Sequence, residues 1–101
     1  QLAWMKQIVI SKATGRFWKH YRELPKEIRL VAKKAYSVFK NDPWYPSLHF
    51  KPVHSGLPVY SIRITIDYRA VGILQNGKVI WFWVGAHSDY DKLLSSLKKS
   101  G

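Results

Sequence analysis

The chain has 101 residues, and its 17 Lys and Arg against 6 Asp and Glu give a formal net charge of +11 at pH 7. A chain of this length predicts one domain, residues 1–101. The absence of cysteine excludes disulfides, thiolate metal sites and cysteine nucleophiles. This positive charge favours the binding of polyanions, and nucleic acid is the first partner to consider. An anionic membrane surface or an acidic protein is the alternative.

The N-terminal region carries no targeting signal that the sequence reveals. Met5 is a possible natural start, which leaves residues 1–4 outside the native chain. No basic-then-apolar signal segment opens the sequence, and the longest apolar run, residues 79–86, is far too short to span a bilayer. We therefore expect a cytoplasmic protein that does not use a membrane.

One strand and one helix are predicted at the start of the chain. Residues 4–11 alternate loosely around a run of Ile and Val, which indicates a strand. Residues 14–24, "TGRFWKHYREL", carry apolar side chains at helical spacing, and Pro25 then interrupts them. Proline is tolerated in the first turn of a helix, so a second helix is expected to begin there.

A long helix with a basic outer face follows. Residues 25–40 have one apolar stripe, and the opposite face carries Lys26, Arg29, Lys33 and Lys40. Asn41-Asp42-Pro43 ends this helix. The proline-punctuated residues 44–58 predict an irregular loop.

The second half of the chain predicts an antiparallel meander. Residues 59–65, "VYSIRIT", alternate so that Arg63 lies on the polar face of a half-buried strand. Residues 68–75 and 78–87 are joined by Asn76-Gly77, which strongly indicates a two-residue hairpin turn because both residues tolerate a positive φ.

Pairing outward from this hairpin places two polar residues at one end of the sheet. Arg69 falls opposite Val84, so Arg69 and His87 lie near the same end. Residues 89–99 have Tyr90 and three leucines at helical spacing and predict a short final helix.

The turn before Arg69 leaves the placement of two arginines open. A two-residue turn at Ile66-Asp67 puts Arg69 on the face of Ile64, away from Arg63. A longer turn or a β-bulge brings the two arginines together.

Three segments in this order, "FWKHYRELP", "YSIRITIDYRAVG" and "FWVGAHSDYDKLL", resemble toxins of the RelE/ParE superfamily, over about Lys6 to Leu94. The resemblance implies an α+β, RelE-like fold: two N-terminal helices packed on a mainly antiparallel four-stranded sheet (β-α-α-β-β-β), with a short C-terminal helix. It also implies a toxin that cuts messenger RNA, usually on the ribosome, and a cognate antitoxin protein that neutralises it.

Two of four candidate residues, Arg69 and His87, match positions that carry the activity in such toxins, and Arg63 occupies a position that is often basic in them. Arg69 matches an arginine at the start of this strand, whose expected role is a phosphate clamp, and Arg63 is placed to share the phosphate. His87 matches a strand-end position and is expected to act as acid or base. Tyr90 is expected to stack on a base or assist proton transfer, with core packing as the alternative.

Metal-free RNA cleavage needs a base, an acid and cations around the phosphate. No cluster of metal-binding carboxylates is visible, so no metal and no cofactor are expected. Some catalytic relatives use a glutamate before the family's arginine as the base, and this chain has no glutamate after Glu27. The base is therefore His87, Asp67, Asp89 or a neutral lysine.

Further basic residues are expected to contact RNA. Lys51 and His54, in the middle loop, are expected to face the active-site cleft that the resemblance implies, with ordinary loop solvation as the alternative. The helix residues Lys26, Arg29 and Lys33 are expected to touch ribosomal RNA, although such a face is usually only solvated.

A different function also fits the resemblance. ParE-like members inhibit DNA gyrase without catalysis. That branch generally lacks an acid or base at the strand end, so His87 argues against this alternative.

Overall fold

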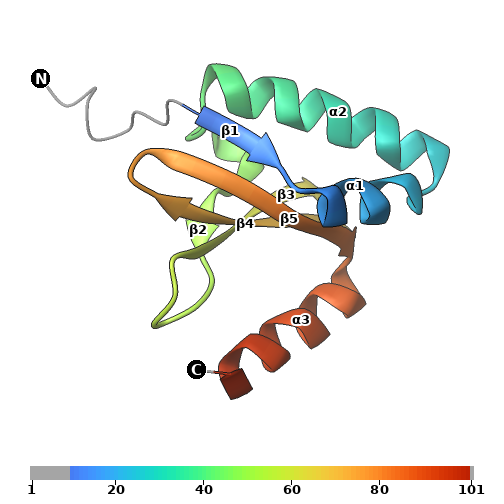
Figure 1. The fold of residues 1–101 in the computed structure, drawn as a ribbon. Helices are drawn as coiled ribbons and strands as arrows, with labels where there is room; N and C mark the ends of the chain where they lie inside the picture. The colour runs from blue at the N-terminus through green and yellow to red at the C-terminus, as the bar shows by residue number, and fades with distance from the viewer. Residues whose placement is uncertain (1–9, 101) are drawn as a thin grey trace, which may run out of the picture.

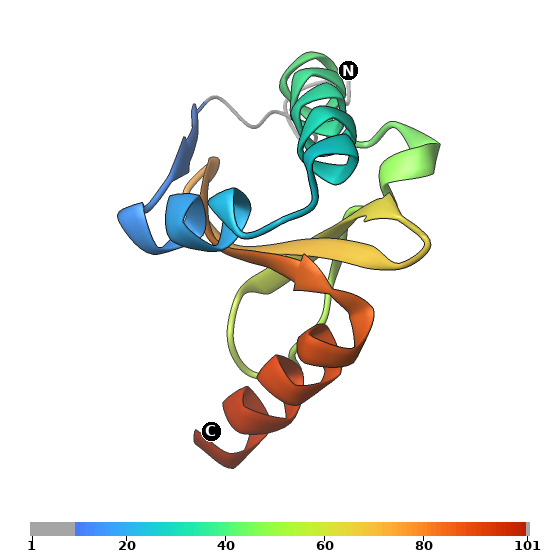
Figure 2. The ribbon, with the colours of Figure 1, turned by 90° about the vertical axis from the view of Figure 1, so that its right-hand side faces the viewer.

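A five-stranded sheet separates two helical layers. The computed structural model describes residues 10–100, with side chains as far as Lys98. Its elements in chain order are β1 (Ile10–Ala13), α1 (Gly15–Arg22), α2 (Lys26–Asn41), the 3-10 helix η2 (Pro46–Leu48), β2 (Lys51–Pro52), β3 (Val59–Thr65), β4 (Tyr68–Gln75), β5 (Lys78–Ala86) and α3 (His87–Ser100) (Figure 1). Helices α1 and α2 cover one face of the sheet, and α3 lies against the other (Figure 2).

The predicted α+β fold is confirmed, with one strand more than expected. The strand order is β1-β5-β4-β3-β2, and only the β1–β5 pair is parallel. The fifth strand, β2, lies in the segment predicted to be an irregular loop and pairs with Tyr60 and Ser61. Two residues are too few to show an alternating pattern, so only the pairing itself reveals this strand.

The first strand is shifted along the chain from its predicted position. It was expected at residues 4–11, but β1 spans Ile10–Ala13 and pairs with residues 78–81 of β5. Residues 4–9 of the predicted strand lie outside the described residues.

The two N-terminal helices begin as the sequence indicates. The Thr14 hydroxyl accepts a hydrogen bond from the Phe17 N–H (3.1 Å) and caps α1. Pro25 is the N-cap residue of α2, which ends where the Asn41-Asp42-Pro43 segment predicts.

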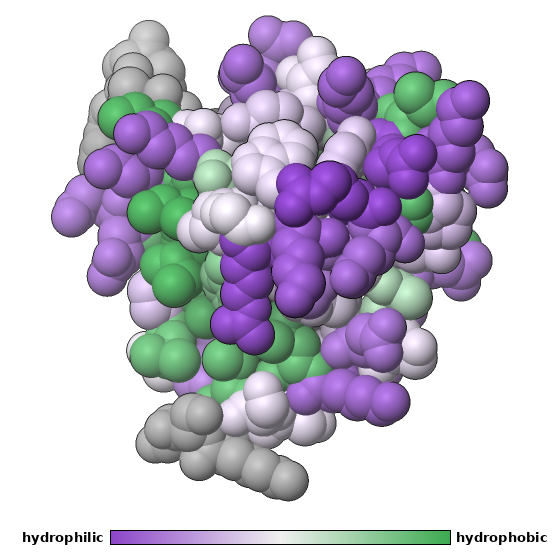
Figure 3. Space-filling model, turned by 45° about the vertical axis from the view of Figure 1, so that its right-hand side comes forward, coloured by the Kyte–Doolittle hydropathy of each residue, from purple (hydrophilic) through white to green (hydrophobic). Residues whose placement is uncertain are grey.

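Each face of the sheet carries its own hydrophobic cluster. On the α1 and α2 side, Trp81 and Phe39 are almost fully buried. On the α3 side, Val71 and Trp83 pack against Tyr90. Hydrophilic side chains make up much of the face seen in Figure 3. No helix of residues 10–100 combines the length and the apolar character needed to cross a membrane.

The hairpin between β4 and β5 sets the position of Arg69. Asn76 and Gly77 have φ of 52° and 74°, as the predicted two-residue turn requires. A bulge then leaves Phe82 without a partner in β4, so Arg69 pairs with Gly85. The expected pairing with Val84 is wrong by one residue because a bulge leaves no signature in the alternation around it.

Close packing at Gly72 yields a stability prediction. An added Cβ there meets the Trp81 ring at 2.8 Å and the Ile80 carbonyl oxygen at 2.9 Å. We expect Gly72→Ala to lower the free energy of unfolding by about 1–3 kcal/mol, measured by urea denaturation. Gly15→Ala is the matched control, since nothing lies within 4 Å of its added Cβ. Equal stability of the two variants contradicts this packing.

Candidate functional site

A β-bulge brings two arginines face to face. Thr65 pairs with Tyr68 around the turn, Ile64 has no partner in β4, and Arg63 therefore pairs directly with Arg69. Of the two arrangements that the sequence left open, the structure has the bulge. Like charges directly opposite each other destabilise a sheet, so the pair is best satisfied by an anion held between them.

The two arginines open onto a small basic hollow. His49, Lys51, Ser61, Arg63 and Arg69 line this hollow, which has a volume of about 40 Å³. None of these five residues is acidic. The basic hollow therefore offers two guanidinium groups, an ammonium and an imidazole to one negatively charged group.

The Arg69 guanidinium is held in place by the turn that it follows. Its Nη1 donates to the backbone oxygens of Thr65 (2.6 Å), Ile66 (3.0 Å) and Tyr68 (3.1 Å). Within the described part of the chain, its Nε and Nη2 have no acceptor and remain able to bind an anion. The Arg63 side chain makes no hydrogen bond to residues 10–98, so it carries charge without such a structural role.

His87 lies at the same end of the sheet as Arg69, as the sequence predicts. It is the first residue of α3, and its backbone N–H donates to the Asp67 carbonyl oxygen (2.7 Å). Its side chain is about half exposed, and Nδ1 lies 3.4 Å from the Asp91 carboxylate. This contact favours a proton on Nδ1, which leaves Nε2 able to accept one.

Tyr90 connects α3 to the basic hollow. Its ring is only 8% exposed and packs on Trp83, while the His87 ring lies 5.7 Å away. Its hydroxyl donates to Ser61 Oγ (3.4 Å), one of the residues that line the hollow. This burial favours core packing, the alternative kept open for Tyr90, over base stacking.

The two middle-loop candidates separate in the structure. Lys51 lines the basic hollow, but His54 does not. His54 Nδ1 accepts from the backbone N–H groups of Gly56 (2.9 Å) and Leu57 (2.8 Å), and Nε2 donates to the Leu97 oxygen (3.3 Å). His54 thus ties the β2–β3 loop to α3.

The basic residues of α2 lie on the other side of the sheet. Lys26 and Lys33 are exposed on this helix, and neither lines the basic hollow. Arg29 donates from Nη1 to the backbone oxygens of Leu24 (2.7 Å) and Arg22 (3.5 Å), so it ties α2 to the end of α1.

His49 and Ser61 are the two residues of the basic hollow that the sequence analysis did not single out, and His49 is the one that carries a titratable group. It lies in the segment predicted to be irregular, and its backbone has φ 50° and ψ 44°, a left-handed conformation that is unfavourable for a residue with a Cβ. The sequence signal that could have identified His49 is its spacing of two residues from Lys51, because alternate residues of an extended chain lie on the same side.

The carboxylates considered as bases lie outside the basic hollow. Asp89 lines a separate hollow together with His20 and Glu23. Asp67 is exposed in the β3–β4 turn. No group of three His, Cys, Asp or Glu side chains in the described part of the chain is placed to hold a metal ion.

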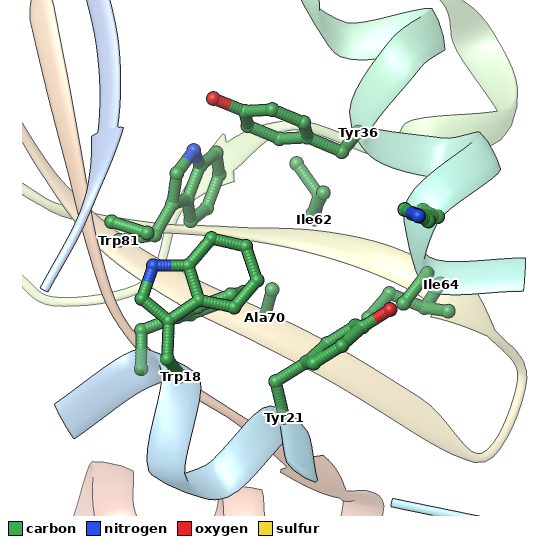
Figure 4. A pocket seen from close by; sticks show the side chains of 11 residues that line it. Trp18, Tyr21, Tyr36, Ile62, Ile64, Ala70 and Trp81 are labelled. Atoms are coloured by element: carbon green, nitrogen blue, oxygen red, sulfur yellow. The ribbon is translucent and has the colours of Figure 1, made fainter. Parts of the chain in front are cut away.

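A second, aromatic pocket lies between α1, α2 and the sheet (Figure 4). Its volume is about 270 Å³, and its walls include Trp18, Tyr21, Tyr36 and Trp81. The Tyr36 hydroxyl donates to the Ser11 carbonyl oxygen (3.2 Å) and the Trp81 indole to the Ser11 hydroxyl (3.0 Å). The pocket therefore suits an apolar group.

The different hydrogen bonding of the two arginines is open to test. We expect Arg69→Ala to lower the free energy of unfolding by about 1–2 kcal/mol, since three carbonyl oxygens lose a charged donor at a half-buried site. Arg63→Ala is expected to change it by less than about 0.5 kcal/mol. Urea denaturation of both variants measures the difference, and equal losses contradict this geometry.

Comparison with known proteins places this architecture in a family. The family model of the ParE-like toxin domain matches residues 26–92, more than half of the chain. No curated protein matches the chain at a significant level.

Solved toxin structures share the fold at low sequence identity. YafQ from E. coli strain BL21(DE3) is 14% identical, with a TM-score of 0.65 over 79% of this chain and 94% of that chain. The RelB–RelE antitoxin–toxin complex from Methanococcus jannaschii matches at 22% identity and a TM-score of 0.62, over 79% and 95%. The YoeB/ParE toxin from Agrobacterium tumefaciens matches at 16% sequence identity and a TM-score of 0.61, over 78% of this chain and 99% of that chain. With its sequence matched by the family model, the chain belongs to the ParE-like toxin domain family, within the RelE/ParE superfamily of toxins.

Proposed function

We propose that this toxin is a metal-independent endoribonuclease that cuts messenger RNA and holds the scissile phosphate at the basic hollow. The observation that carries the proposal is the direct opposition of Arg63 and Arg69 beside Lys51, with no acidic residue in the lining. Such a cluster is unfavourable by itself and becomes favourable when a phosphate binds.

The lining of the basic hollow, together with His87 at the same end of the sheet as Arg69 but outside that lining, supplies the groups that RNA cleavage needs. In the proposed reaction, His87 Nε2 accepts the proton of the 2′-OH, whose oxygen attacks the adjacent phosphorus. The two guanidinium groups and Lys51 stabilise the charge that builds on the phosphorane. The bond from phosphorus to the 5′ oxygen then breaks, and the imidazole of His49 donates a proton to that leaving oxygen. The products are a cyclic phosphate and a 5′-hydroxyl.

Tyr90 has a positioning role in this scheme. Through Ser61 it holds the start of α3, and with it His87, against the strand that carries Arg63. Lys26 and Lys33 lie on the far face and are proposed to contact ribosomal RNA while the message occupies the basic hollow. We place this activity in the cytoplasm, where messages and ribosomes meet.

A cognate antitoxin is the proposed protein partner. The RelE of Methanococcus jannaschii was solved in complex with the RelB antitoxin. On this chain, the aromatic pocket suits a large apolar side chain, and Lys33 at its wall suits an acidic neighbour of that side chain. An acidic antitoxin segment with one apolar anchor satisfies both features.

The test of the ribonuclease is a map of messenger RNA 5′ ends in cells without antitoxin. We expect new 5′ ends on induction of the wild-type protein, and a loss of about 10²- to 10⁴-fold in cleavage for folded His87→Ala. Arg63→Ala is expected to lose cleavage while keeping its stability. Lys78→Ala, at the opposite end of the sheet, serves as a control and is expected to cut normally.

One outcome of this experiment favours the other branch of the superfamily. Growth arrest with intact messages, equal in wild type and both site variants, overturns the ribonuclease. The family's description as ParE-like then directs the search to DNA gyrase, where DNA damage signalling is the expected readout.

A further inference from the structure

A groove on the α2 side of the sheet edge continues from the basic hollow. It lies between α2, η2 and β3 and has a volume of about 700 Å³. Its lining includes Lys34 and Val38 from α2, Tyr45 and His49 from either end of η2, and Arg63 and Ile64 from β3. We call it the flanking groove.

The flanking groove and the basic hollow share two residues. His49 and Arg63 line both. The reason is the short fifth strand: β2 pairs with Tyr60 and Ser61 only, so β3 is the free edge of the sheet at Arg63. One continuous surface therefore passes around this edge from the hollow into the groove.

The lining of the groove suits a flat ring joined to a phosphate. Lys34, His49 and Arg63 are basic, and no acidic residue lines the groove. Its floor is apolar, with Val38 and Ile64 among its residues. Tyr45, at the rim, is 49% exposed and presents an aromatic ring to solvent. Basic side chains combined with an exposed aromatic ring are the features that bind single-stranded nucleic acid.

The η2 turn holds Tyr45 and His49 in fixed positions. Leu48, within the turn, is 2% exposed and anchors it in the core. The backbone N–H of Leu48 donates to the Tyr45 oxygen (3.0 Å), and that of His49 donates to the Pro46 oxygen (3.2 Å). The left-handed backbone at His49 ends the turn and places this residue between the groove and the hollow. The backbone from which both side chains project is therefore fixed before a ligand arrives.

We propose that the flanking groove binds the nucleotide next to the scissile phosphate in single-stranded RNA. Tyr45 stacks on the base of this nucleotide, and Lys34 binds its phosphate. Arg63 and His49 contact the backbone between the two subsites. The inference rests on the proposed ribonuclease function and adds a subsite to it, which makes Tyr45 a determinant of affinity.

The experiment measures the affinity of a 2′-O-methyl RNA tetranucleotide, which lacks the attacking hydroxyl, by fluorescence anisotropy. We expect Tyr45→Ala to bind it about 5- to 100-fold more weakly than wild type. Tyr45→Phe retains a stacking ring and is expected to bind within twofold of wild type. Lys34→Ala is expected to lower the affinity and to make the affinity less dependent on salt concentration. Lys19→Ala, on α1, removes the same charge elsewhere and serves as the control. It is expected to keep the affinity and its salt dependence within twofold of wild type.

A tetranucleotide with one base removed distinguishes two reasons why Tyr45→Ala could bind weakly: the loss of stacking on a base, or a disturbed protein structure. If Tyr45 stacks on a base, removal of that base at one position weakens binding to wild type but has little further effect on Tyr45→Ala. If the losses in binding free energy from base removal and from Tyr45→Ala add at every position, Tyr45 does not stack on a base and the proposed subsite is overturned.

Lys51→Ala, a substitution in the basic hollow, distinguishes failure of the proposed subsite from failure of the proposed ribonuclease function. If Lys51→Ala weakens binding and Tyr45→Ala does not, the flanking groove is not a nucleotide subsite and the ribonuclease proposal stands. If neither variant weakens binding, both the subsite and the proposed function fail.

Discussion

The β-bulge at Ile64 is the constraint on which the rest of the candidate site depends. Without it, strand alternation places Arg63 and Arg69 on opposite faces of the sheet. With it, the two guanidinium groups face each other across β3 and β4, next to Lys51 from β2. The bulge thus converts two separate surface charges into one site that favours a phosphate.

Arg69 combines two roles that mutation alone does not separate. Its Nη1 closes the β3–β4 turn, so its removal affects the folded state as well as any bound anion. Arg63 has no such bonds in the described part of the chain and therefore reports on binding alone. Tyr90 resembles Arg69 in this respect, because its buried ring stabilises the core while its hydroxyl holds Ser61.

The sheet divides the molecule into surfaces of different chemistry. The basic hollow is lined by residues of β2, β3 and β4 and by His49, and the flanking groove shares His49 and Arg63 with it. The aromatic pocket, between α1, α2 and the sheet, is nearly apolar (Figure 4), and the Tyr36 hydroxyl and the Trp81 indole N–H in its walls are both hydrogen-bonded to Ser11. A basic surface and an apolar pocket thus lie at different places on one small domain.

The sequence by itself determined the helices, the Asn76-Gly77 hairpin and the placement of His87 at the same end of the sheet as Arg69, because each depends on local spacing or on the φ that a residue tolerates. Only the tertiary structure decided the two bulges, the strand β2, the burial of Tyr90 and the place of His49. Each of these depends on which residues meet across strands, and a shift of one residue leaves the local pattern nearly unchanged while it moves a side chain to the other face.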